Sequence, residues 1–162
     1  MSASNKPAAE LSIDEALVRR LLAEQHPDLA DRTLVEVAAG WDNVVYRLGD
    51  ELAIRLPRRA LGAELVDAEH RWLPQLAPRL PLPIPAPIRV GHPTGTYPWR
   101  WSIVPWLPGR SAAETPPAEP AAAAALLGQF VFALHQSAPP DAPVNPYRGG
   151  PLADRHAITA ER

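Results

Sequence analysis

The spacing of apolar residues in the first third of the chain predicts one helix followed by three strands. Apolar residues recur at helical spacing from Ile13 to Leu22 behind a Ser12–Glu15 capping box, so we expect a helix over about 12–25. Short runs rich in valine, leucine and isoleucine follow, separated by polar and glycine positions, as is typical of strands. The strands are expected over 33–39, 44–48 and 52–56, with a tight turn at 49–51.

The middle of the chain predicts a second helix, an extended crossing and two more strands. A helical pattern runs from 62 to about 77, with Pro74 inside it. The face expected to be apolar holds Leu65, Ala68, Trp72, Leu73 and Leu76. Prolines at every second position over 81–87 indicate an extended segment, and strands are expected over 88–91 and 99–104.

The last third predicts a linker and an alanine-rich helix. The linker spans 110–118, and the helix spans about 119–136. We expect it to bury Leu126, Leu127, Phe130, Val131 and Leu134. Residues 137–152 are rich in proline and glycine, and 153–162 resemble the start of a further helix. We therefore expect three parts: a disordered tail over 1–11, a compact α+β unit over 12–109, and a remainder over 110–162.

Composition narrows the classes of function. The chain has 162 residues with no cysteine, which excludes disulfides, thiolate zinc sites and cysteine nucleophiles. The formal net charge of −2 provides no electrostatic case for nucleic acid or a membrane surface, and no run of about 20 apolar residues is present. No metal-binding spacing of histidines occurs either. We expect a cytoplasmic protein, and since Lys6 is the only lysine, any cation inside the folded unit must be arginine.

Four short phrases resemble the aminoglycoside phosphotransferase family. In chain order they are GWDNVVYRLG at 40–49, AIRLPR at 53–58, EHRWLP at 69–74 and WLPG at 106–109. Their order and spacing are similar to those of a protein-kinase-like amino lobe, in which an antiparallel sheet of about five strands packs with a helix. The resemblance implies that 12–109 is this lobe with its hinge. It also implies that the helix over 119–136 is the first helix of a carboxyl lobe, truncated soon afterwards.

The resemblance implies where a nucleotide would bind. Backbone N–H groups of the loop Gly40, Trp41, Asp42 and Asn43 would cradle the phosphates of ATP or GTP. Arg55 would hold the α- and β-phosphates and pair with Glu69 on the next helix, with Glu64 as the second choice of partner. Many relatives use lysine where this chain has Arg55; arginine keeps the charge and can bind two phosphate oxygens. Arg58 and Arg59 are expected to form a solvated turn.

The same resemblance implies a hinge that recognises the base. Val104 would lie behind the base, the carbonyl of Pro105 would accept a hydrogen bond, and the N–H of Leu107 would donate one. The structural alternatives remain open at this point: an ordinary hairpin loop at 40–43, a solvent-facing Arg55, and a plain exit from a strand at the hinge.

Residues for phosphoryl transfer itself are missing from the sequence. The family carries an H-G-D-x-x-x-x-N element and a later aspartate for Mg²⁺, and beyond Gly109 the only aspartates are Asp141 and Asp154, neither in such a context. The chain is therefore expected to hold no catalytic residue and no metal ligand. It is interpreted as the nucleotide-binding half of a small-molecule kinase, inactive alone, with the acceptor bound only if a carboxyl lobe is supplied. The alternatives are a non-catalytic module that binds nucleotide or a partner, and a structural α+β domain.

Overall fold

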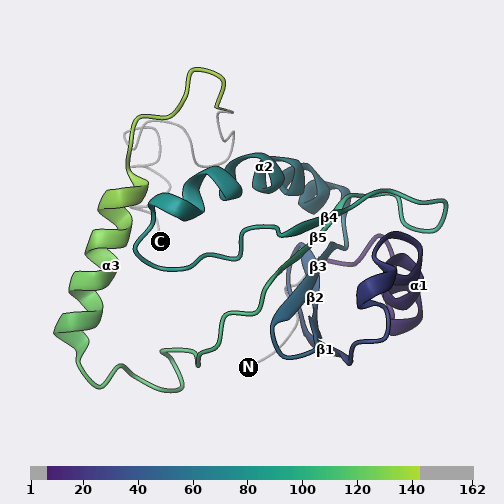
Figure 1. Cartoon of the computed structure of the whole chain (residues 1–162), viewed down its shortest axis with the longest axis horizontal. Coiled ribbons are helices and arrows are strands. Elements are labelled where there is room, and N and C mark those ends of the chain that lie inside the picture. Colours follow the sequence, from purple (N-terminus) through teal and green to yellow (C-terminus); the bar gives the residue numbers. More distant parts are fainter. Residues whose placement is uncertain (1–6, 143–162) are drawn as a thin grey trace.

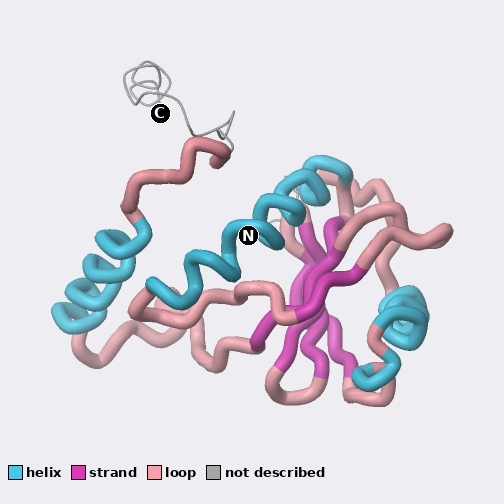
Figure 2. Tube along the Cα trace, turned by 45° about the horizontal axis from the view of Figure 1, so that its top comes forward, coloured by secondary structure: helices cyan, strands magenta, loops and turns pink. Residues whose placement is uncertain are grey.

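The structure, a computed structural model, describes residues 7–142. These residues form a five-stranded sheet with one helix on each face, and a third helix stands apart at the end of a long connection (Figure 1; Figure 2). The elements are α1 (Glu15–Gln25), β1 (Leu34–Ala39), β2 (Asn43–Leu48), β3 (Leu52–Pro57), α2 (Ala60–Leu76), β4 (Arg89–Gly91), β5 (Trp101–Pro105) and α3 (Pro120–Leu134).

The sheet has the order β1-β2-β3-β5-β4, and every neighbouring pair is antiparallel. The predicted α+β class with about five antiparallel strands is confirmed. The β2–β3 hairpin turns at Gly49, whose φ of 61° is a conformation that a side chain would strain. Because residues paired across a sheet share a face, two rows of side chains run across β2, β3 and β5 on the α2 side. They are Val45–Arg55–Ser102 and Arg47–Ala53–Val104.

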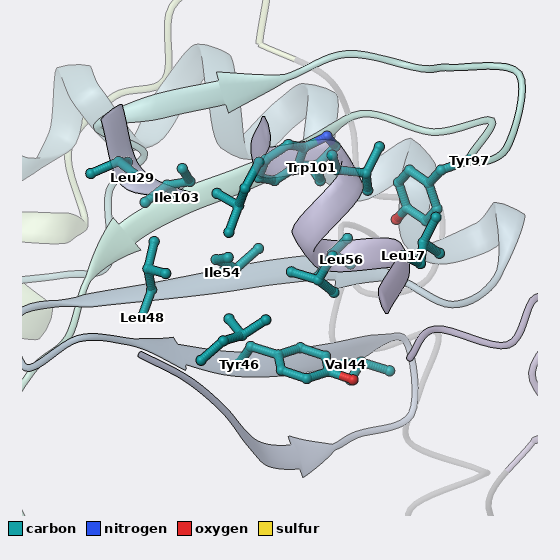
Figure 3. Close-up of a cluster of buried hydrophobic side chains, with 14 residues drawn as sticks. Leu17, Leu29, Val44, Tyr46, Leu48, Ile54, Leu56, Tyr97, Trp101 and Ile103 are labelled. Carbon is teal, nitrogen blue, oxygen red and sulfur yellow. The ribbon is translucent and has the colours of Figure 1, made fainter. Parts of the chain in front are cut away.

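The hydrophobic core lies between α1 and the other face of the sheet (Figure 3). Leu17, Val18, Leu21 and Leu22 of α1 lie at helical spacing, so they form one stripe toward the strands. Opposite them are the alternate strand residues Val44, Tyr46, Leu48, Ile54, Leu56, Trp101 and Ile103. The period of two along each strand therefore divides the sheet into an apolar α1 face and a mixed α2 face.

The start of α1 differs from the prediction. The helix begins at Glu15, and its N-cap is Asp14, whose side chain accepts a hydrogen bond from the N–H of Leu17 at 2.8 Å. Ser12 was expected in that role. Aspartate is as good an N-cap residue as serine. Asp14 also lies three positions before Leu17, whose N–H has no partner within the helix.

The segment before α1 is hydrogen-bonded to the connection between β3 and α2. Glu10 donates its N–H to the carbonyl of Arg58 at 2.9 Å, and its carboxylate accepts from the N–H of Ala60 at 2.9 Å. The first free N–H of α2 is thus satisfied by a residue 50 positions away in the chain, a partner that no local capping pattern could indicate. Part of the segment expected as a tail therefore contributes to the start of α2.

Helix α2 continues past its internal proline. Pro74 lacks an N–H, so it leaves the carbonyl of His70 without the usual helical donor, and the helix ends two residues later at Leu76. A short 3-10 turn, Ala77–Arg79, follows before the proline-rich crossing.

The expected burial of α3 is wrong. No residue of this helix is buried among the described residues, and Phe132 is 78% exposed. The other exposed apolar residues are Leu126, Leu127, Val131 and Leu134, while Phe130 is half-buried. The apolar spacing was read correctly as a helix, but burial also needs a second surface, and within residues 7–142 none covers it (Figure 1). The helix expected at 153–162 lies outside the described residues.

Candidate functional site

An arginine–carboxylate ion pair lies between the sheet and α2. Nη1 of Arg55 lies 2.9 Å from Oε2 of Glu69, and Nη2 lies 3.3 Å from Oε1, so the two groups meet as a fork. The two side chains are 23% and 28% exposed. The pair is the one that the resemblance implied, and Glu64 makes no ion pair within the described residues. The guanidinium is thus held in one direction and still reaches solvent, so a ligand could reach it.

The face of α2 that turns to the sheet is mixed, with the apolar Val66 beside Glu69 and His70, which corrects the predicted apolar face. The inward positions Val66, Glu69 and His70 follow helical spacing, and Leu65, expected inward, is 46% exposed. The apolar pattern predicted that Leu65 faces the sheet, but the next residue, Val66, does so instead. Polar partners on the strands, together with the buried Val66, decide which side of α2 faces the sheet.

His70 makes a second contact with the sheet that sequence reasoning missed. Its Nε2 lies 2.7 Å from Oγ of Ser102 on β5, and Ser102 is only 1% exposed. Burial lowers the pKa of His70 below its ordinary value, aided by the positive charge of Arg100, so the ring is neutral near pH 7. One signal was available: Ser102 is a polar residue inside an otherwise apolar strand, and such a residue needs a partner.

The loop between β1 and β2, residues 40–43, is fastened to the start of α2. The turn is closed by the N–H of Gly40, which donates to the carbonyl of Asn43 at 2.7 Å. Arg58 donates from Nη1 to the carbonyl of Gly40 at 3.1 Å and from its backbone to the carbonyl of Asp42 at 2.8 Å. Arg59 pairs with the Asp42 carboxylate at 3.5 Å.

Arg58 and Arg59 therefore do not form the solvated turn that was expected; they hold the loop. Helix α2 also packs directly beneath it, because a Cβ on Gly62 would lie 2.8 Å from the carbonyl oxygen of Asp42. A larger residue at Gly62 would push the loop away. At the tip of the loop, Trp41 is 60% exposed.

The sheet ends in a hinge at the end of β5. Val104 is buried opposite Ala53, and Pro105 pairs with Leu52. The next residue, Trp106, donates its N–H to the carbonyl of Glu51 at 2.7 Å, which ties the chain to the β2–β3 turn as it leaves the sheet.

Beyond Trp106 the chain leaves the sheet and is exposed to solvent. Arg47 stacks over the Trp106 ring at 5.2 Å and so holds this side chain against the sheet. Leu107 is half-exposed, and its N–H has no acceptor among the described residues. Among the expected hinge residues, Val104 is thus buried, and the backbone N–H of Leu107 has no acceptor within residues 7–142.

Two hollows lie elsewhere on the described part of the chain. One, of about 440 Å³, lies between the end of α1 and the loop after β4 and includes His26. The other, of about 490 Å³, lies between the C-terminal ends of α2 and α3 and includes Trp72. Neither is lined by Arg55 or Glu69. The candidate site is the face of the sheet bordered by the loop, α2 and the hinge.

A sequence model described as the phosphotransferase enzyme family matches residues 33–162. The chain belongs to this family. The match includes the Arg55–Glu69 pair, the loop at 40–43 and the hinge, so all parts of the candidate site lie within the phosphotransferase region. A search by sequence among curated proteins finds no match.

Solved structures of phosphotransferases share the fold. The GDP complex of wild-type aminoglycoside 2'-phosphotransferase-IIIa has a TM-score of 0.74 at 18% identity, covering 92% of this chain and 51% of that one. The GDP and kanamycin complex of an APH(2") enzyme has a TM-score of 0.70 at 18% identity, covering 89% and 50%. A streptomycin–ATP–APH(2") ternary complex has a TM-score of 0.56 at 17% identity, covering 80% and 43%.

These likenesses concern the fold, and this chain spans about half the length of the solved structures that it resembles. Within residues 7–142, no helix is both long and apolar enough to cross a membrane. The same residues contain no group of three histidine, aspartate or glutamate side chains suited to a metal ion.

Proposed function

We propose that this chain is the nucleotide-binding half of a phosphotransferase that moves the γ-phosphoryl group of ATP or GTP to a hydroxyl of a small molecule. The observation that carries the proposal is the Arg55–Glu69 fork, a cation directed by a carboxylate on the mixed face of the sheet and still about a quarter exposed. A guanidinium held in this way offers two parallel donors to phosphate oxygens without having to order a free side chain first.

The phosphate end of the nucleotide would lie beneath the loop of residues 40–43. The loop is held from the α2 side by Arg58 and Arg59. In this arrangement Trp41, Asp42 and Asn43 would supply backbone N–H groups to the phosphates, as small loops at the edge of a sheet do in other phosphate sites. A loop that is already fastened loses less conformational entropy when a ligand binds.

The base would lie against Ala53 and Val104, two small buried side chains that face each other in neighbouring strands. The carbonyl of Pro105 would accept a hydrogen bond from the base, and the free N–H of Leu107 would donate one. This proposal is supported by the exposure of Leu107 and by the absence of an acceptor for its N–H among residues 7–142. The choice between ATP and GTP depends on which base edge meets this donor and acceptor.

Transfer chemistry would need residues that the sequence does not carry. Mg²⁺ needs oxygen ligands, and residues 7–142 contain no suitable group. Because the sequence has no H-G-D-x-x-x-x-N element, our proposal assigns the Mg²⁺ ligands and the aspartate that orients the acceptor hydroxyl to a complementary half. Two of the similar structures contain kanamycin or streptomycin, and an aminoglycoside-like acceptor is therefore the first class to test once a complementary half is supplied. The chain alone is expected to be inactive.

A second candidate function is a non-catalytic module that binds a partner chain. The specific observation is α3, whose apolar residues are exposed, with Phe132 at 78%. Exposed apolar side chains in this number favour association with another surface. Such a module would bind its partner whether or not Arg55 is intact.

The test is calorimetric titration of Mg·ATP and of Mg·GTP into the full chain, with Arg55→Ala and Arg55→Lys as variants. Loss of a charged hydrogen-bond partner costs about 1.5–3 kcal/mol, so Arg55→Ala should weaken binding roughly ten- to a hundredfold. Arg55→Lys should weaken it less, because a single charged donor remains. The matched control is Arg89→Ala, which removes an arginine that pairs with Asp28 at 2.8 Å on the far edge of the sheet. Equal losses for Arg55→Ala and Arg89→Ala, or no binding of either nucleotide by the wild-type chain, would contradict the proposal.

A further inference from the structure

Two successive residues of α2 bind two neighbouring strands. Glu69 meets Arg55 on β3, and His70 meets Ser102 on β5. Arg55 and Ser102 lie directly opposite each other in the β3–β5 register. The four side chains therefore form one compact group, in which any rotation of α2 about its axis would disturb both contacts together.

The two contacts differ in their surroundings. The His70–Ser102 bond is short, at 2.7 Å, and Ser102 is the only buried polar or charged residue in the described part of the chain. A buried hydroxyl that loses its partner is strongly unfavourable, so this bond favours one position of the helix. The Arg55–Glu69 pair is partly solvated, and an ion pair in such a setting contributes little to stability on its own.

The buried bond is therefore the better candidate for setting the position of α2, and the ion pair follows from it. We propose that His70 is a positioning residue: its hydrogen bond to Ser102 sets the rotation of α2 on the sheet, so that Glu69 directs Arg55 toward the phosphates of a bound nucleotide. This inference rests on the proposed function.

The charges around His70 act on its pKa in opposite directions, because Asp67 and Glu69 raise it while Arg100 and His92 lower it. Asp67 and Glu69 lie on the same helix, while Arg100 and His92 approach from the segments flanking β5 and β4. Asp67 pairs with Arg100 at 3.5 Å, so part of the local negative charge is already matched. Burial is the largest influence and lowers the pKa of His70, which leaves a neutral side chain whose role is to give and accept hydrogen bonds.

The experiment compares nucleotide affinity with stability in the full chain. Mg·ATP and Mg·GTP are titrated into His70→Leu, His70→Gln and Ser102→Ala, and each variant is also unfolded in urea. His70→Leu and Ser102→Ala should each lower affinity roughly tenfold, as for coupled neighbouring sites. His70→Gln should recover most of it, because glutamine offers both a donor and an acceptor to Ser102 whichever histidine tautomer is present.

The double variant His70→Leu with Ser102→Ala separates positioning from structure. Replacing both partners by apolar groups removes the unpaired buried hydroxyl, so stability should return toward that of the wild type. Affinity should remain low, because a leucine contact does not fix a rotation in the way that a hydrogen bond does. Recovery of affinity together with stability would show that the bond is merely structural and would overturn the inference.

The effect of Glu69→Gln gives a second measure. It should weaken nucleotide binding in the wild-type background and have a clearly smaller effect in His70→Leu, where Arg55 is already misdirected. The control is Val18→Ala, which removes core volume on the opposite face and should leave affinity unchanged while the protein is folded.

The failures of the two proposals are distinguishable. If Arg55→Ala weakens binding and His70→Leu does not, this inference falls and the proposed function stands. If the wild-type chain binds neither nucleotide, both fall.

Discussion

The two faces of the same sheet are covered by different kinds of contact. Residues that alternate along β3 and β5 send Ile54, Leu56, Trp101 and Ile103 to the α1 face, all of them buried in the core (Figure 3). Their neighbours on the α2 face include Arg55 and Ser102, together with the small side chains of Ala53 and Val104. One face is closed by apolar packing, and the other is covered only in part, through polar contacts.

Under the proposed function, this difference assigns stability to one face of the sheet and nucleotide binding to the other. The α1 face removes large apolar side chains from water, which is the main source of folding free energy. The α2 face directs hydrogen-bonding groups and leaves some of them accessible. Substitutions on the first face should therefore act on unfolding, and substitutions on the second should act on ligand affinity.

The sharpest test of this comparison is Trp101→Ala against Glu69→Gln. Trp101 is fully buried, and removal of a buried tryptophan side chain costs about 3–5 kcal/mol, so we expect a large drop in the urea midpoint. Glu69→Gln should change the free energy of unfolding by less than about 1 kcal/mol, because the ion pair is partly solvated. Similar losses of stability for the two variants would break the distinction between the faces.

Gly91→Ala should have an intermediate effect on the same core. A Cβ on Gly91 would lie 1.8 Å from Cε2 of Trp101, its partner in the β4–β5 register, so the ring would have to move. Overpacking of this kind costs about 1–3 kcal/mol in the free energy of unfolding. Gly95→Ala is the matched control, because a Cβ there would meet nothing within 4 Å. If both substitutions leave the urea midpoint unchanged, the packing of Trp101 on β4 is looser than described.

The smallest effect concerns pH and involves one histidine on each face. Burial lowers the pKa of His26, which lies edge-on to Trp101 at 5.4 Å, and of His70, below the ordinary value of 6.5. As pH falls below 6.5, these side chains bind protons in the unfolded chain before they do so in the folded one, so stability should fall. Above that pH their contribution is fully present. Each histidine can add a slope of at most about 1.4 kcal/mol per pH unit.

Urea unfolding at several pH values between 7.5 and 5.5 (about one unit either side of the histidine transition) measures this slope. His26→Gln and His70→Gln should each flatten part of it, since glutamine does not titrate. A variant carrying both changes that keeps the full wild-type slope would show that other groups cause the dependence.

Local pattern was sufficient for most of the fold. The sequence predicted the first three strands, the hairpin at Gly49 and helices that nearly coincide with α1, α2 and α3. This was possible because periods of 2 and 3.6 residues are properties of neighbouring positions. The match to the phosphotransferase family over 33–162 is in agreement with the four phrases that suggested it. The Arg55–Glu69 contact also followed from the resemblance, whereas the nucleotide-binding role of these and the other site residues stays a prediction.

The features that were missed all depend on a partner distant in the chain. The inward face of α2 was misjudged because Leu65 is more apolar than His70, although Ser102, 32 positions beyond His70, is the group that needed a partner. Arg58 and Arg59 were expected in solvent because their acceptors, Gly40 and Asp42, belong to another loop.

Sequence by itself determined the order of the elements and the two-sided alternation of the strands, because both are encoded in spacing along the backbone. It also indicated the family, through four short phrases that resemble it. Only the tertiary structure decided how α2 is rotated, which arginines hold the loop of residues 40–43, how Glu10 caps a helix 50 residues away, and that α3 is uncovered within residues 7–142. The physical reason is common to these cases. A polar side chain is placed by the partner that compensates for its loss of water, and that partner is found only when the chain has folded.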